Sequence, residues 1–202
     1  EDEVLKGSLL ITLYENLRWK TISPQGFRDE MLAYLPNESN SLLFSMALSY
    51  LGDCQRIFPS DSRPLGQALW KIVTTNPVSQ HRLQAFRLYR SIADSEEAVQ
   101  RLYTLWQERK APKDCTLSES DYIGLSYMLA MHLPEKADKI IATQLSRIQN
   151  PDRKKEYQFI SPSVSPRKAE RDSVFASLLI AGNRRVEPWA SSALANLNHR
   201  LR

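Results

Sequence analysis

The sequence predicts an all-α protein, in which about ten antiparallel helices stack as a HEAT-like or ARM-like α-α superhelix. Apolar residues recur at helical spacing along nearly the whole chain, and the alternation typical of β-strands is almost absent. The linkers between the periodic segments are short, which favours antiparallel neighbours. A compact bundle is the alternative architecture. We favour the stack, because ten helices cannot all surround one core whereas hairpins can each bury one face against the next.

The individual helices are predicted from apolar stripes with steps of three or four residues. The first stripe is Leu5, Leu9, Leu13 and Leu17, widened by Leu10 and Tyr14. Further stripes, in chain order, fall within residues 27–35, 43–57, 65–73, 83–92, 99–106, 122–133, 137–148, 174–179 and 189–197. Within the stripe at 174–179, the predicted buried residues are Val174, Phe175, Leu178 and Leu179.

Capping and breaking residues mark where these helices begin and end. Starts are predicted at Ser23-Pro24, at a capping box of Asp94 and Glu97, at a second box of Ser118 and Asp121, and at Asn150-Pro151. Gly182 is predicted to end a helix in the left-handed conformation. We expect residues 1–202 to form a single α-helical superhelical domain, part of a longer chain. Residues 150–166 are expected to be an irregular, basic, proline-containing connection within it.

The positive charge is concentrated near the C-terminal end. Residues 151–202 carry 10 Lys and Arg against 5 Asp and Glu, whereas the rest of the chain is balanced at 17 against 18. The cations form three clusters, Arg153 to Lys155, Arg167 to Arg171, and Arg184 with Arg185. An anionic partner could meet this end. Aromatic residues do not lie among the cations and no nucleic-acid module is recognisable, so we expect no nucleic-acid partner.

Catalytic and metal-binding patterns are absent from the sequence. The three histidines, His81, His132 and His199, are isolated, and no H-E-x-x-H, G-x-S-x-G, P-loop or G-x-G-x-x-G motif occurs. The two cysteines, Cys54 and Cys115, are predicted to be free thiols. We therefore expect no catalytic residue, no metal site and no cofactor in this chain. No apolar stretch approaches the ~18 residues of a membrane span.

Four segments near the C-terminal end resemble the C-terminal helical region of bacterial zinc metallopeptidases of the aminopeptidase N family, which are gluzincins. They are NPDRKKEYQFISPSVSP at 150–166, RDSVFASLL at 171–179, NRRVEPW at 183–189 and LNHRLR at 197–202. The segment LYENL at 13–17 is also similar to one that follows the catalytic domain of such enzymes. Across residues 20–115 only the helical character agrees.

The resemblance implies a non-catalytic domain that lies over the catalytic cleft of its parent enzyme and limits the access of peptides. The family's zinc ligands and exopeptidase motif have no counterpart here, so zinc is expected only in the parent's catalytic domain. That domain of the same polypeptide is the expected partner, together with the peptide substrate. Arg184 and Arg185 are the candidates for contacting a peptide carboxylate or an acidic catalytic domain. Related chains continue beyond LNHRLR, and any targeting signal is expected upstream.

A free-standing helical scaffold that binds other proteins is the alternative to this reading. It requires no enzyme elsewhere in the polypeptide, and its fold would be the same. Binding of nucleic acid through the basic end is a third hypothesis, and it predicts an affinity that falls steeply with salt. The sequence alone leaves the first two open.

Overall fold

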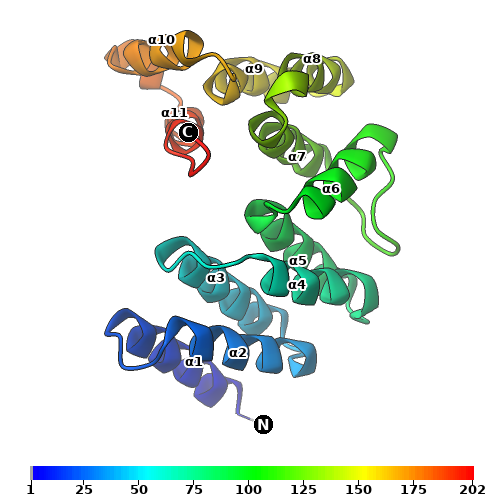
Figure 1. Cartoon of the computed structure of the whole chain (residues 1–202), viewed down its shortest axis with the longest axis vertical. Helices are drawn as coiled ribbons and strands as arrows, with labels where there is room; N and C mark the ends of the chain where they lie inside the picture. The colour runs from blue at the N-terminus through cyan, green and yellow to red at the C-terminus, as the bar shows by residue number, and fades with distance from the viewer. Residues whose placement is uncertain (1) are drawn as a thin grey trace. The chain divides into compact units, whose positions relative to one another are not determined.

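The computed structural model describes residues 2–202 and shows the all-α class. The described chain contains eleven α-helices and no β-strand (Figure 1). The α-helices are α1 (Glu3–Arg18), α2 (Pro24–Tyr34), α3 (Ser41–Ile57), α4 (Arg63–Thr75), α5 (Ser79–Ile92), α6 (Glu96–Glu108), α7 (Glu119–His132), α8 (Ala137–Arg147), α9 (Pro151–Ile160), α10 (Lys168–Leu178) and α11 (Glu187–Leu197). Four short 3₁₀ helices accompany them: η1 (Leu35–Asn37), η2 (Pro134–Lys136), η3 (Ser161–Val164) and η4 (Ala181–Arg184).

Three of the four predicted helix starts are confirmed. The Ser23 hydroxyl accepts a hydrogen bond from the backbone N–H of Gly26 at the start of α2. Ser118 and Asp121 form the predicted capping box of α7. The Asn150 side chain accepts two backbone N–H groups at the start of α9. These side chains satisfy amide groups that have no partner within their own helix.

The fourth start is displaced by one residue. Helix α6 begins at Glu96, and the hydroxyl of Ser95 accepts a hydrogen bond from the Ala98 N–H at 3.3 Å. Asp94, the predicted cap, instead accepts a hydrogen bond from the hydroxyl of Ser62. The Asp94 carboxylate is therefore bound to a residue 32 positions away in the sequence, and Ser95 caps α6 in its place.

The chain divides into two compact units, each of which we describe by itself. The first contains α1 to α5, the beginning of α6 and the segment Arg109–Thr116. The second contains the end of α6, Leu102–Glu108, and α7 to α11 within Leu117–Arg202. A single superhelical domain over residues 1–202, which the sequence predicts, remains a prediction.

In the first unit, α3 lies against α1, α2 and α5, and α4 pairs with α5 (Figure 1). The largest fully buried side chains of this unit include Leu17, Phe27, Phe44, Leu51, Leu69 and Phe86. In the second unit, α7 pairs with α8, while α9, η3, α10 and α11 pack together. The end of α6 joins this unit through Trp106, whose Nε1–H donates to Oε1 of Gln144 at 2.8 Å.

The apolar face of α1 differs from the predicted stripe. Leu10 and Leu17 are buried, but Leu5 and Leu9 are 58% and 55% exposed. The predicted four-residue stripe is therefore wrong in its N-terminal half. Helix α1 carries apolar residues on more than one face, and α2 and α3 cover only the face that contains Leu10.

The segment 150–166 is more regular than we expected. Asn150 caps α9, Pro151 occupies its first turn, and Pro162 lies in the first turn of η3. These prolines start helices, because the first turn needs no donor from them. Gly182 is not a left-handed cap, and none of the glycines in residues 2–202 has a positive φ. Helix α10 already ends at Leu178, and Ile180 leaves it in an extended conformation.

Candidate functional site

Arg184 and Arg185, the candidate contact residues, lie in the connection between α10 and α11. Arg184 is the last residue of η4 and Arg185 follows it, and both side chains are exposed. Within residues 2–202, neither guanidinium has a hydrogen-bond or ion-pair partner. Glu187 lies exposed in the first turn of α11, where the helix dipole favours an acidic side chain.

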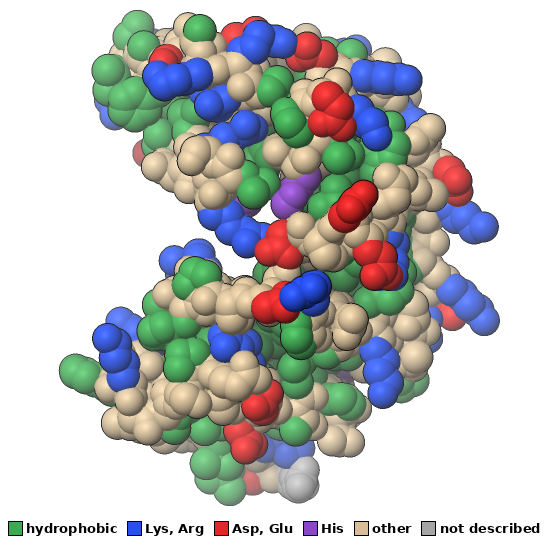
Figure 2. Space-filling view, viewed as in Figure 1, with side chains coloured by type: hydrophobic (Ala, Val, Ile, Leu, Met, Phe, Trp, Pro, Cys, Tyr) green, Lys and Arg blue, Asp and Glu red, His purple; other side chains and the backbone are tan. Residues whose placement is uncertain are grey.

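Large apolar side chains are exposed beside these two arginines. Phe175 and Leu179 are 52% and 68% exposed, although both belong to the stripe that predicted burial. Ile180 is 62% exposed and Val186 is 44% exposed. We name the set of Phe175, Leu179, Ile180, Arg184, Arg185 and Val186 the α10–α11 surface. In Figure 2, hydrophobic side chains gather at the upper left, where Figure 1 places the end of α10.

The α10–α11 surface rests on a packed framework. Beneath it, Leu178, Ala190 and Ala193 form a buried cluster, against which Val174 packs. The turn after α10 is held by the Asn183 side chain, whose Nδ2 donates to the carbonyl oxygen of Ser177 at 3.0 Å. Trp189 is half-buried, and the centroid of its ring lies 5.8 Å from that of the Phe159 ring. The exposed residues are thus presented on helices that pack below them.

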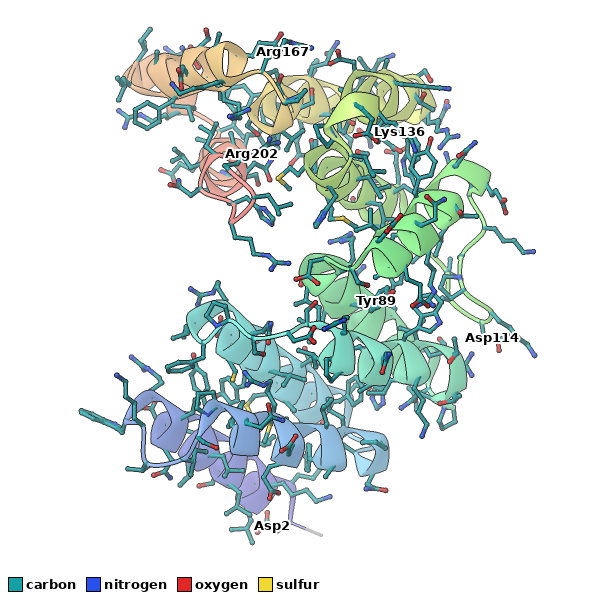
Figure 3. The ribbon with its side chains drawn as sticks, in the orientation of Figure 1. Asp2, Tyr89, Asp114, Lys136, Arg167 and Arg202 are labelled. Carbon is teal, nitrogen blue, oxygen red and sulfur yellow. The ribbon has the colours of Figure 1, made fainter. Side chains whose placement is uncertain are left out.

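Most cations of the other two basic clusters are bound by contacts within the second unit, whereas Lys154 is exposed and unpaired within residues 2–202. Arg167, at the start of α10 (Figure 3), binds Asp138 at 2.8 Å and Glu170 at 2.6 Å. These contacts raise the pKa of Arg167. Arg153 pairs with Glu119 at 3.4 Å, and Arg171 donates to backbone carbonyl groups before α10. The three clusters look alike in the sequence, but the structure leaves the guanidinium groups of Arg184 and Arg185 for an external partner.

A groove of about 560 Å³ runs along the other side of α10. It is lined by Phe159, Pro162, Ala169, Glu170, Ser173, Val174 and Ser177. The only ionisable side chain in this lining, Glu170, is already bound to Arg167. The Arg167 guanidinium also holds the pKa of Glu170 below its usual value. The groove therefore offers apolar contact but no free charged group.

The first unit contains one serine–histidine pair within hydrogen-bond distance, the arrangement found in catalytic dyads. Oγ of Ser41 lies 3.0 Å from Nε2 of His81, across 40 positions of sequence. His81 is fully buried, as is common for an isolated histidine, and its ring stacks on Phe44 at 3.9 Å. Burial lowers the pKa of His81, which favours the neutral form of the ring.

The groups that a Ser–His nucleophile needs are missing around this pair. Nδ1 of His81 is buried without a partner in the described chain, so no carboxylate orients the ring. The N–H groups of Leu42 and Leu43, which could stabilise an oxyanion at the start of α3, already donate to Oδ1 of Asn40. The pair is therefore a buried polar contact rather than a catalytic site.

Comparison with protein-family models, with characterised proteins and with solved structures found no match for this chain. Within residues 2–202, no three side chains among His, Cys, Asp and Glu are grouped so that they could hold a metal ion. None of the described helices is long and apolar enough to cross a membrane. Cys54 and Cys115 are free thiols, as predicted, and both are buried.

The sequence analysis selected Arg184 and Arg185 but did not predict that the four apolar residues of the α10–α11 surface are exposed. Phe175 and Leu179 were assigned to the core because their spacing is helical, and a stripe does not reveal whether a partner covers it. The signal that could have found them is the width of the stripe. At about 100° per residue, the apolar residues at 174, 175, 178 and 179 span about 140° of one side of α10, and Phe175 and Leu179 lie at one edge of this stripe.

Proposed function

We propose that this chain is a non-catalytic C-terminal helical domain of a bacterial zinc aminopeptidase of the aminopeptidase N family. Its role is to cover the catalytic cleft and to limit which peptides enter. The observation that carries the proposal is that the segments of resemblance supply the framework of the second unit. Asn150 caps α9, Tyr157 and Val164 are fully buried, and Ser163 binds Asn196 of α11. The resembling segment 150–166 thus has structural roles in the second unit, whereas most residues of NRRVEPW at 183–189 are exposed.

In this role the chain supplies shape and charge, while chemistry belongs to the catalytic domain. A domain of packed helices excludes water and large substrates from a neighbouring site without taking part in bond cleavage. The α10–α11 surface offers apolar side chains and two free guanidinium groups to a neighbour. Arg184 and Arg185 suit a peptide carboxylate or an acidic face of the catalytic domain, because the guanidinium fork binds carboxylates through two hydrogen bonds.

The test uses the full parent polypeptide and peptides of increasing length. The double variant Arg184→Glu/Arg185→Glu is expected to change kcat/KM for long peptides by about tenfold, the effect of ~1.4 kcal/mol, and to leave a single-residue chromogenic substrate unaffected. The matched control is Lys154→Glu/Lys155→Glu, which makes the same change of charge on the exposed face of α9. A parent without peptidase activity, or length selectivity that is equal in all three proteins, contradicts the proposal.

A free-standing protein-binding scaffold is the second candidate, and the exposed apolar residues favour it equally. The coding sequence upstream of this chain separates the two. An H-E-x-x-H motif followed by a distant Glu supports the aminopeptidase, because the two histidines and the distant Glu hold the zinc ion in that family. A start codon close to Glu1 supports the scaffold.

A further inference from the structure

We propose that the α10–α11 surface binds an acidic amphipathic helix. The apolar stripe of that helix covers Phe175, Leu179 and Ile180, and its carboxylates bind Arg184 and Arg185. This inference rests on the proposed function and deepens it, because it names the chemistry of the surface against which the helical domain lies.

The arrangement of the apolar residues favours a helix as the partner. Phe175 and Leu179 are four residues apart, so they form a ridge along one face of α10. Such a ridge packs into the groove between the ridges of a second helix. Ile180 and Val186 add two more exposed apolar side chains in the connection that leads from α10 to α11.

The charges favour an acidic partner. Arg184 and Arg185 have no partner in the described chain, whereas the nearby cations are bound: Lys168 pairs with Asp172 at 2.6 Å, and Arg171 donates to backbone carbonyl oxygens. Two neighbouring guanidinium groups repel each other and keep all their donors in water until a carboxylate arrives. A helix that carries carboxylates one turn apart presents two of them on one face, one for each guanidinium group.

An anionic membrane is the other class of partner that apolar and basic residues could serve. The local composition argues against it. Residues 168–189 carry 4 Lys and Arg against 3 Asp and Glu. Membrane-binding segments gather about 4 to 8 cations with few acidic residues among them, so the near balance here suits a protein surface better.

The experiment measures binding of synthetic helical peptides to the full 202-residue chain by fluorescence anisotropy. The probe is a labelled, stapled peptide of about 14 residues, ~21 Å long, with Leu at helical spacing and Glu flanking the stripe. A second peptide carries Lys in place of every Glu. We expect the chain to bind the Glu peptide at least ~10-fold more tightly than the Lys peptide, with an affinity that falls as salt rises.

Three variants locate the binding site. Arg184→Glu/Arg185→Glu is expected to reverse the preference, so that the Lys peptide binds more tightly than the Glu peptide. Leu179→Ala is expected to weaken binding of both peptides, because it removes the centre of the apolar ridge. Lys154→Glu/Lys155→Glu is the control of equal charge and is expected to retain the preference. All the substituted side chains are exposed, and circular dichroism confirms that each variant keeps its helices.

The inference is overturned if neither peptide binds, if both bind equally, or if the control reverses the preference as strongly as the arginine variant does. It is also overturned if the chain binds vesicles of phosphatidylcholine and phosphatidylserine and not the Glu peptide. These outcomes are separate from the proposed function. If the parent enzyme shows length-dependent peptidase activity but its helical domain does not bind the Glu peptide, only the acidic-helix inference is wrong. If the parent has no peptidase activity, the proposed aminopeptidase role is wrong.

Discussion

Replacing Tyr157 by Phe tests a polar contact in the core of the second unit. Tyr157 is fully buried, and its hydroxyl lies 2.9 Å from Oγ of Ser126. Ser126 donates its single hydrogen to the carbonyl oxygen of Ile123 at 2.7 Å, so Tyr157 is the donor in this pair. Tyr157→Phe therefore removes one hydrogen bond and leaves the Ser126 donor satisfied. The expected loss in the free energy of unfolding is about 1 kcal/mol.

The neighbouring Tyr127 provides a matched control. Its ring stacks on that of Tyr157, with centroids 5.0 Å apart and planes inclined by 11°. Its hydroxyl is buried without a partner in the described part of the chain, and burial raises its pKa. Tyr127→Phe removes the same atoms as Tyr157→Phe but breaks no hydrogen bond. We expect it to leave stability unchanged or to raise it by up to ~1 kcal/mol, because an unsatisfied buried hydroxyl is lost.

Urea unfolding followed by far-ultraviolet circular dichroism measures both changes. A difference of about 1 kcal/mol corresponds to roughly 2–4 °C in Tm for a chain of this length. Ser126→Ala sharpens the test, because it strands the buried Tyr157 donor and should cost about 2 kcal/mol, more than Tyr157→Phe itself. The reasoning is refuted if Tyr127→Phe destabilises the protein as much as Tyr157→Phe, or if Ser126→Ala is the mildest of the three.

Three further predictions concern other buried polar groups. Burial lowers the pKa of His81 from its usual value of 6.5, so below about pH 6.5 the unfolded chain binds a proton that the folded chain does not. The free energy of unfolding should therefore fall as pH drops from about 7 to about 5. His81→Phe should make this dependence on pH less steep, and an equal dependence in the wild type and the variant would contradict the prediction. Gln144→Leu leaves the buried Nε1–H of Trp106 without its acceptor and should lower the free energy of unfolding by about 1–3 kcal/mol in urea titrations, whereas no loss would show that the N–H finds another acceptor. Asp121→Ala removes half of the capping box with Ser118 and should cost about 1 kcal/mol, and a thermal midpoint within error of the wild type would count against the box.

Features set by neighbouring residues were predictable from the sequence. The starts of α2, α7 and α9 follow from Ser23, Ser118 and Asn150, because each cap binds amides two or three residues ahead of it. The all-α class follows in the same way from the apolar period. Where a distant residue binds the predicted cap, a prediction from neighbouring residues alone is wrong. Asp94 binds Ser62, and α6 is capped by Ser95.

Contacts between residues far apart in the sequence could not be predicted from the spacing of residue types. Arg153, Arg167 and Arg184 belong to clusters that look equivalent in the sequence. The first two meet carboxylates from other helices, Arg153 that of Glu119 and Arg167 that of Asp138. Only the fold brings these helices together, so the sequence names every cation but does not show which of them is already neutralised.

The errors in predicted burial are themselves informative about function. On α1 and on α10, helical spacing marked Leu5, Leu9, Phe175 and Leu179 as core residues, and all four are more than half exposed. Fully burying such side chains yields about 1.5–3 kcal/mol each, so a partner that covers the remaining half of these four could gain roughly 3–6 kcal/mol. Unfilled apolar faces of this kind are uncommon on proteins that act alone. The proposed packing of this domain against a catalytic partner would cover such faces.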